Sequence, residues 1–263
     1  MGKIISFANQ KGGVGKTTTC INLAAYVAAF GKKVLVVDMD PQGNSTSGLG
    51  VNKNLKLLTL YDAIDGEKDI TEVIRRTGVK GLDIVPATVD LAGAEVELVS
   101  MRSREKVVKD LLKKVKDNYD YIFIDCPPSL GLLTINALTT SNSVVIPIQC
   151  EFFALEGLSQ LMNTIKLVKK HLNENIDVEG VILTMKVSRS NLIQDVSTEI
   201  KRFFGKKVYE TYIPRSIRLA EAPSHGKPIM QYDAKSKGGV AYYELAKEFL
   251  TRNKDSYKNI TNF

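Results

Sequence analysis

A glycine-rich segment between an apolar run and a helical pattern constrains the fold more than any other feature of this sequence. Its residues are Lys11, Gly12, Gly13, Val14, Gly15, Lys16, Thr17 and Thr18. The apolar run covers residues 4–8 and the helical pattern residues 16–30, so the segment is predicted to join a buried strand to a helix. Glycines allow the tight turn that brings several backbone N–H groups together, and the helix start adds the positive end of its dipole. The segment therefore predicts a phosphate-binding loop.

Two side chains of this loop carry the expected chemistry. Lys16 supplies a positive charge for the β- and γ-phosphates of a nucleotide, and the Thr17 hydroxyl can ligate Mg²⁺. The common phosphate-loop pattern has a glycine five residues before its last glycine. Here that position is Gln10, so the loop departs from the common form.

Strand and helix patterns alternate along the whole chain. Apolar runs predict strands at residues 34–37, 82–85, 121–124, 144–148 and 181–183, and helices are predicted at residues 102–117, 130–141, 154–172 and 191–204. Such continuous apolar strands separated by helices predict an α/β fold, with a mostly parallel twisted sheet and helices on both faces. The 263 residues suit one phosphate-loop NTPase domain, predicted over residues 1–253, followed by a polar, frayed tail at 254–263.

Carboxylates follow two of the predicted strands. Asp125 ends the run 121–124, which is the pattern of an acid that holds the water shell of Mg²⁺. Asp38 and Asp40 follow the run 34–37 and are expected beside the phosphates. Either could cap a helix or loop, and one could also position a water molecule for hydrolysis.

The cysteines and the N-terminus indicate the compartment. Cys20, Cys126 and Cys150 lie far apart and match no metal-ligand spacing, which favours buried, reduced thiols. The N-terminus lacks the pattern of a signal peptide, and no apolar run is long enough to span a bilayer. We expect a cytoplasmic protein.

The net charge of +7 is concentrated in the last third of the chain. Residues 180–263 contain 15 Lys and Arg against 8 Asp and Glu, whereas residues 1–179 contain 21 of each. A basic surplus of this kind indicates either a polyanionic partner or a solvated basic face.

Three motifs together resemble the deviant-Walker-A ATPases of the ParA/MinD class: KGGVGKTT, DMDPQGN and DCPPSLG, which begin at Lys11, Asp38 and Asp125. The resemblance runs from Lys3 to about Leu250. It implies an ATP- and Mg²⁺-dependent ATPase that forms a homodimer with nucleotide between the subunits. Lys11 would reach the phosphates bound by the partner, which resembles the task of an arginine finger. Gly12 would lie at the dimer seam.

The resemblance also implies roles for residues within one subunit. Lys16 and Thr17 would bind phosphate and Mg²⁺. Asp40 would orient the attacking water, Asp38 would support the metal and the switch region, and Asp125 would be the Walker B acid. Pro214 and Ser216, after a strand expected at 208–213, match the segment that contacts adenine, although many relatives have Asn at the position of Ser216.

A nucleotide site does not show what process the ATPase serves, and four kinds of protein are candidates: DNA-partitioning, membrane-binding, iron–sulfur and tyrosine-kinase proteins. The C-terminal segment lacks the apolar face of a membrane-binding helix. The three cysteines do not match a shared iron–sulfur site, and a tyrosine-rich tail typical of bacterial tyrosine kinases is absent. DNA partitioning is the favoured interpretation, with a MinD-like ATPase that cycles on a membrane as the alternative.

The basic last third favours DNA. Nine Lys and Arg lie within residues 186–227, against four acids. By the resemblance, Arg189 and Arg218 match positions that bind double-stranded DNA without sequence preference. The resemblance further implies slow turnover accelerated by a ParB-type (Spo0J-like) centromere-binding partner, a location on the nucleoid, and in some hosts an influence on a replication initiator or on sporulation.

Overall fold

The computed structural model describes residues 2–151, 154–186 and 191–257. Within them, seven strands form one sheet in the order β3-β4-β2-β5-β1-β6-β7, parallel except that β3 runs antiparallel to β4. The strands are β1 (Lys3–Phe7), β2 (Val34–Asp38), β3 (Arg75–Arg76), β4 (Leu82–Val85), β5 (Tyr121–Asp125), β6 (Ser143–Gln149) and β7 (Asp177–Thr184). The predicted α/β class with a mostly parallel sheet is confirmed.

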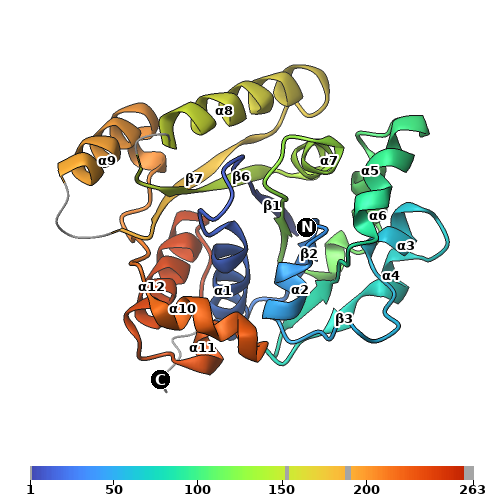
Figure 1. Cartoon of the computed structure of the whole chain (residues 1–263), viewed down its shortest axis with the longest axis horizontal. Helices are drawn as coiled ribbons and strands as arrows, with labels where there is room; N and C mark the ends of the chain where they lie inside the picture. Colours follow the sequence, from blue (N-terminus) through green and yellow to red (C-terminus); the bar gives the residue numbers. More distant parts are fainter. Residues whose placement is uncertain (1, 152–153, 187–190, 258–263) are drawn as a thin grey trace.

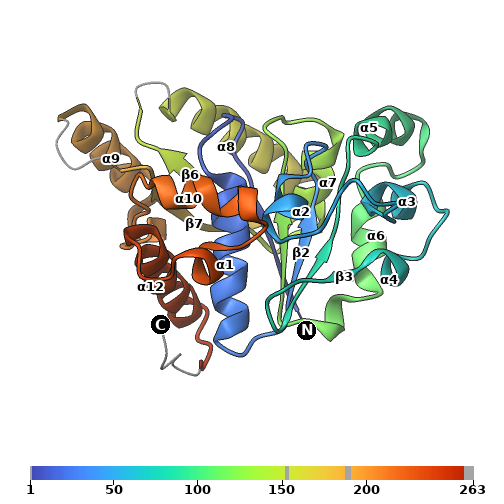
Figure 2. The same cartoon turned by 60° about the horizontal axis from the view of Figure 1, so that its bottom comes forward.

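Helices cover both faces of this sheet (Figures 1 and 2). The first face carries α1 (Lys16–Ala29), α2 (Asn44–Gly48), α10 (Ile217–Glu221), α11 (Ile229–Tyr232) and α12 (Lys237–Arg252). The second carries α3 (Leu60–Ile64), α4 (Ile70–Val73), α5 (Leu91–Ser100), α6 (Val107–Lys113), α7 (Leu132–Thr140), α8 (Ala154–His171) and α9 (Asn191–Phe204). No described helix is both long and apolar enough to cross a membrane.

Each central strand supplies side chains to both cores. In β5, Phe123 packs under α1 and α12, whereas its neighbours Ile122 and Ile124 pack on the second face. Successive side chains of a strand point to opposite faces, so a strand buried on both sides reads as an unbroken apolar run. This arrangement explains why the apolar runs identified six of the seven strands.

The register of the central strands gathers three chain segments at one edge. Phe7 of β1 and Asp38 of β2 both pair with Asp125 of β5. The glycine loop follows β1 at its carboxyl end. The carboxyl ends of these parallel strands lie side by side. The loop and the two aspartates are therefore neighbours.

The predicted helix over residues 102–117 is shorter than expected. Ser103 adopts a left-handed φ of 53°, and α6 begins only at Val107. Asn136 of α7 accepts a hydrogen bond from the amide of Val108 at 3.2 Å and donates one to the carbonyl of Arg104 at 2.7 Å. A side chain from another helix thus sets where α6 starts.

The strand expected at 208–213 is wrong. This segment, which the structure describes in full, forms isolated bridges, from Val208 to Val181 of β7 and from Pro214 to Lys186 just after it. Its backbone bonds to β7 are those of the Tyr209 amide to Val181 and of the Ile213 amide to Leu183. Between these bridges, the amides of Glu210 and Thr211 donate to the carboxylate of Glu248 on α12. A side chain therefore takes the hydrogen bonds that a strand ladder would have used.

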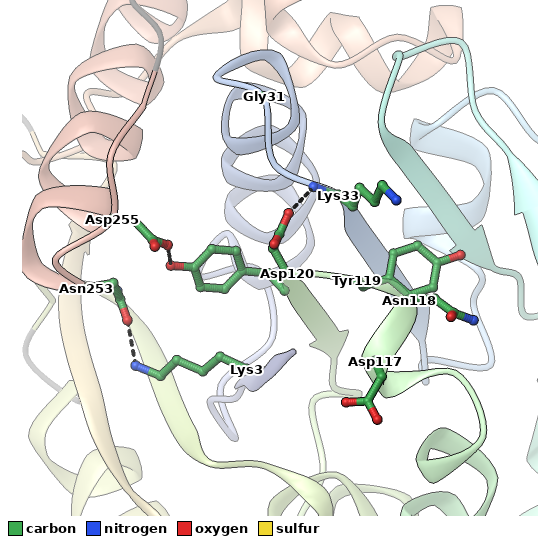
Figure 3. Close-up of a pocket in the computed structure, with 10 residues that line it drawn as sticks. Lys3, Gly31, Lys33, Asp117, Asn118, Tyr119, Asp120, Asn253 and Asp255 are labelled. Carbon is green, nitrogen blue, oxygen red and sulfur yellow. Dashed lines mark hydrogen bonds between the residues drawn. The ribbon is translucent and has the colours of Figure 1, made fainter. Parts of the chain in front are cut away.

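The start of the C-terminal tail packs at the amino end of the sheet (Figure 3). Asn253 accepts a hydrogen bond from Lys3 at 2.7 Å, and Asp255 accepts one from Tyr121. Asp255 also pairs with Lys32 at 3.2 Å. The expected fraying is therefore wrong for residues 254–257, and residues 258–263 lie outside the described part of the chain.

Candidate functional site

The glycine loop connects β1 to α1 in a conformation that exposes backbone N–H groups. Gly13 and Gly15 have φ of 73° and 85°, a region in which a side chain would be strained. Gly15 is the N-cap of α1, and no described side chain caps this helix. The first-turn amides of a 14-residue helix therefore point out of its N-terminus, the arrangement that binds phosphate.

Lys16 is a buried cation at the start of α1. It is 6% exposed, and its ammonium donates to the carbonyl of Lys11 at 3.1 Å. Burial lowers the pKa of Lys16, whereas the negative charges of Asp125 and Asp40 raise it. The ammonium is thus held inside the loop, where an anion would restore the favourable environment of its charge.

Asp125, at the end of β5, has one oxygen occupied and one unpaired. Its Oδ2 accepts a hydrogen bond from Ser45 at 2.8 Å. Its buried Oδ1 has no partner within the part of the chain that the structure describes. Burial raises the pKa of Asp125, and the hydrogen bond from Ser45 together with the nearby Thr17 hydroxyl opposes this rise. An unpaired buried carboxylate oxygen beside a threonine hydroxyl fits Mg²⁺ or a water of its shell.

Asp38, at the end of β2, anchors the segment that follows it. Its Oδ2 accepts from the amide and the hydroxyl of Thr46 at 2.8 and 2.7 Å, and its Oδ1 from the amide of Asp40 at 3.2 Å. Burial and the charge of Asp125 raise the pKa of Asp38. Asp38 therefore fixes α2 next to Asp125, and its role toward a metal stays a prediction.

Asp40 lies beside the loop in a turn. Its Oδ1 accepts the amide of Gln42 at 2.9 Å, and its carbonyl accepts the amide of Gly43 at 2.8 Å. Asp40 is 7% exposed and lies close enough to Lys16 for its charge to raise the pKa of that lysine. The expected role of Asp40 in orienting water stays a prediction, but the structure brings this carboxylate to the loop.

Lys11 and Gly12 occupy the outer side of the loop. The ammonium of Lys11 pairs with Glu151, which follows β6, and both side chains are partly exposed. A Cβ built on Gly12 would meet no atom within 4 Å. This side of the loop is therefore open, and Gly12 is not required there by contacts within its own described chain.

A cavity of about 250 Å³ adjoins the loop. Its lining includes Gly15, Thr18, Thr184, Pro214, Ser216 and Tyr242. The structure thus brings Pro214 and Ser216 to the loop, about 200 residues away in sequence. Met185, also in the lining, has a left-handed φ of 51°, a conformation that costs energy for a residue with a side chain.

Sequence reasoning missed several residues of this site. Ser45 bonds Asp125, Glu151 pairs with Lys11, and the hydroxyl of Thr184 donates to the carbonyl of Val14 at 2.8 Å. Tyr242 reaches Thr19 of α1 at 3.1 Å. None of them stands in a recognisable motif, because each contacts a residue distant in sequence.

The structure describes only one of the two predicted DNA-binding arginines. Arg189 lies outside the described residues. Arg218, in α10, is half-exposed and pairs with Glu221 at 3.0 Å and with Asp233 at 3.4 Å. Between residues 210–215 and α12, an open depression of about 890 Å³ has Lys186, Arg215, Lys235 and Lys237 in its lining, together with Glu210 and Glu244.

Known proteins resemble this chain over nearly its whole length. A family model described as an AAA domain matches residues 2–178. The sporulation initiation inhibitor protein Soj of Bacillus subtilis is 60% identical over 94% of this chain and 98% of its own. The chromosome partitioning protein ParA of Myxococcus xanthus is 52% identical, over 96% and 89%. The chromosome-partitioning ATPase Soj of Treponema pallidum is 51% identical, over 96% and 99%.

Solved structures share the fold. A cobyrinic acid a,c-diamide synthase of Mycobacterium smegmatis with bound ADP and magnesium is 34% identical, covers 100% of both chains and superposes with a TM-score of 0.85. The cell division ATPase MinD of Pyrococcus furiosus is 28% identical over 95% of this chain and 99% of its own, with a TM-score of 0.78.

Proposed function

Because this chain belongs to the ParA/MinD family, among the Soj and ParA chromosome-partitioning ATPases, we propose that it is itself an ATPase that partitions DNA. The unpaired Oδ1 of Asp125, next to Thr17 and the buried cation Lys16, carries this proposal. It is a place for a metal ion beside a loop shaped for phosphates.

Residues of the loop and aspartates at the ends of β2 and β5 have separate roles in ATP hydrolysis. The amides at Gly13–Gly15 and the Lys16 ammonium bind the β- and γ-phosphates, while Thr17 and Asp125 would hold Mg²⁺ or its water shell. Bound Mg²⁺ neutralises phosphate charge. Asp40 orients the attacking water, and Asp38 keeps the segment from 38 to 46 in place through its bonds to Thr46.

The cavity beside the loop receives the adenine. Its lining joins Gly15 and Thr18, of the loop and the start of α1, to Pro214 and Ser216. A base that is largely enclosed by such a lining fixes the orientation of the phosphates.

ATP also joins two subunits in this proposal. Lys11 and Gly12 face outward, and the ammonium of Lys11 is held by Glu151 rather than by the loop it belongs to. In an ATP-bound dimer, Lys11 exchanges this partner for the phosphates of the other subunit. A charge delivered only in the dimer makes turnover in the isolated subunit slow.

The output is DNA binding without sequence preference, gated by the dimer. The charge surplus of residues 180–263 and the depression lined by Lys186, Lys235 and Lys237 suit a polyanion, and a dimer doubles this surface. Hydrolysis, accelerated by a ParB-type partner, then releases the nucleoid. Identity to the partitioning relatives, at 51–60%, exceeds the 34% to the synthase and the 28% to MinD.

The test is DNA binding by the Asp40→Ala protein with ATP, with ADP and without nucleotide. We expect binding with ATP only, equal for unrelated sequences, and falling with salt at a log–log slope of about −0.9 per phosphate contacted. Asp110→Ala, at an exposed aspartate of α6, is the matched control and should turn over ATP normally.

Two outcomes would contradict the proposal. Normal turnover by Asp40→Ala would remove Asp40 from the mechanism. Failure to bind DNA in every nucleotide state, together with ATP-dependent binding to anionic liposomes, would favour the MinD-like membrane cycle.

A further inference from the structure

The segment from Gly205 to Pro214 crosses the surface beside β7 and ends in the base cavity. It leaves the short helix η2 (Gly205–Lys207) and reaches Pro214 without forming a strand. The amides of Tyr209 and Ile213 donate to the carbonyls of Val181 and Leu183 of β7 at 2.9 and 2.8 Å. The residues before and between these two bonds need other contacts to fix their path, because ordering a free backbone costs conformational entropy. α12 provides these contacts through two side chains one helical turn apart.

Arg252 binds the first half of the segment. Its guanidinium donates to the carbonyls of Lys206, Lys207 and Val208 at 3.1, 3.4 and 2.8 Å. The same group lies over the ring of Tyr209, 4.1 Å from its centroid. A planar guanidinium is suited to several carbonyls and an aromatic face at once, whereas a lysine ammonium is not.

Glu248 binds the second half. One carboxylate oxygen accepts the amide of Glu210 and the other the amide of Thr211, both at 2.9 Å. Glu248 also pairs with Arg252 at 2.7 Å, and the two side chains are 18% and 27% exposed. A carboxylate that receives two amides and a guanidinium makes charge-assisted hydrogen bonds, which are stronger than neutral ones.

The same helix also builds the opposite part of the cavity lining. Tyr242 of α12 lines the cavity, and its hydroxyl bonds Thr19 of α1 at 3.1 Å. Pro214 and Ser216 follow Thr211 by three and five residues. α12 therefore supplies Tyr242 to the cavity lining and also holds the segment that leads to Pro214 and Ser216. α12 itself packs on α1, the helix that begins at the phosphate loop.

We propose that Glu248 and Arg252 are positioning residues for nucleotide binding, which hold residues 206–211 so that Pro214 and Ser216 keep their place against the base. This inference rests on the proposed function, because it takes the cavity to be the adenine site. Glu248 and Arg252 contact neither the phosphate loop nor Asp125 among the hydrogen bonds and ion pairs of the described residues, so their effect should fall on the base alone.

The test compares two ligands that share the phosphates but not the base. Binding of Mg–ATP and of inorganic tripolyphosphate is measured by calorimetry for the wild type, Glu248→Gln and Glu174→Gln. Glutamine at 248 keeps the size of the side chain but replaces one accepting oxygen by a donor and removes the charge. Glu174 is exposed and lines neither the cavity nor the basic depression, so it is the matched control.

We expect Glu248→Gln to bind ATP about tenfold more weakly, which corresponds to the loss of one hydrogen bond to a charged group. Tripolyphosphate affinity should be unchanged, KM for ATP should rise, and kcat at saturation should stay the same. Glu174→Gln should match the wild type in all four quantities. If Glu248→Gln does not fold, Arg252→Lys, which keeps the charge but not the planar fork, should show the same pattern at smaller size.

Loss of both affinities in parallel would show a general effect on the domain and overturn the inference. Unchanged ATP affinity would overturn it as well, while leaving the proposed function in place. A wild type that binds neither ligand would instead refute the proposed function on which the inference rests.

Discussion

Single residues of the loop differ in what surrounds them within one subunit. Lys16 is buried with its ammonium turned to a backbone carbonyl and near two carboxylates, whereas Gly12 faces open space. The first residue is thus expected to act within its own subunit. The second matters only when something else approaches the loop. A substitution at Lys16 therefore tests nucleotide binding by one subunit, and a substitution at Gly12 tests the contact between subunits.

Replacing Lys16 by alanine should abolish nucleotide binding. The substitution removes the charge nearest the expected phosphates, and we expect ATP affinity to fall about 100-fold, in line with about 1.5–3 kcal/mol for a hydrogen bond to a charged group. Calorimetric titration with Mg–ATP measures the loss. Lys56→Ala, at an exposed lysine, should bind ATP as the wild type does, and unaltered affinity in Lys16→Ala would refute the phosphate-loop assignment.

Replacing Gly12 by valine should spare the subunit and block the dimer. A Cβ at Gly12 meets no atom within 4 Å, and its φ lies outside the left-handed region. Unfolding free energy should therefore change by less than about 0.5 kcal/mol, as for ordinary surface positions. ATP should still bind, but sedimentation in the Asp40→Ala background should show monomers with ATP. An ATP-dependent dimer would place Gly12 away from the subunit interface.

At the scale of elements, side chains from one element determine where another begins, ends or bends. Asp38 of β2 holds Thr46 of α2, and Thr46 in turn accepts the amide of Ala87 after β4 at 2.9 Å. The ends of two strands and the start of a helix are thus tied by one threonine. Close approach also shapes β7, where Gly180 makes room for the segment at 206–211.

Gly180→Ala should destabilise the protein, and Gly157→Ala should not. A Cβ at Gly180 would lie 2.3 Å from the ring of Tyr209 and 2.9 Å from the carbonyl of Lys207, whereas one at Gly157 of α8 meets nothing within 4 Å. Overpacking typically costs about 1–3 kcal/mol, while alanine in a helix interior gains about 0.5–1 kcal/mol over glycine. Urea unfolding compares the two variants. Equal stability would mean that Tyr209 moves away without cost.

At the scale of the whole molecule, residues near the start and near the end of the described chain bond to each other at the amino end of the sheet (Figure 3). Lys3 donates to Asn253 at 2.7 Å and to Glu179 at 2.6 Å. Glu179 of β7 also accepts from Ser143 at 2.5 Å and from Asn253 at 2.9 Å. Although burial opposes it, this set of donors lowers the pKa of Glu179. The carboxylate therefore joins β1, β6, β7 and the end of α12.

Glu179→Gln should lower stability at neutral pH and matter less in acid. A carboxyl pKa lowered by folding adds stability that is complete above the unfolded pKa of about 4.3 and is lost as pH falls through the folded pKa. At pH 7 we expect a loss of about 1–3 kcal/mol in unfolding free energy. Denaturant curves from pH 7 down to 3 should show the difference shrinking. Glu174→Gln, at an exposed glutamate, is the control, and a loss independent of pH would contradict the assigned cause.

Much of the fold and site could be predicted from contiguous residues. Apolar runs marked the six longer strands, and glycines followed by Lys16 and Thr17 marked the loop. Aspartates at strand ends marked Asp38, Asp40 and Asp125, which the parallel register then places together. These features are local because burial on both faces, backbone freedom and charge at a strand end each leave a signature within a few residues.

Tertiary structure decided what depends on contacts between distant segments. It left one oxygen of Asp125 unpaired while Ser45 took the other, directed Lys11 to Glu151, and enclosed the cavity with Tyr242. It also turned an expected strand at 208–213 into a segment held by Glu248 and Arg252. A carboxylate can compete with a strand for backbone amides only when the fold brings it within reach, and no local pattern records that proximity.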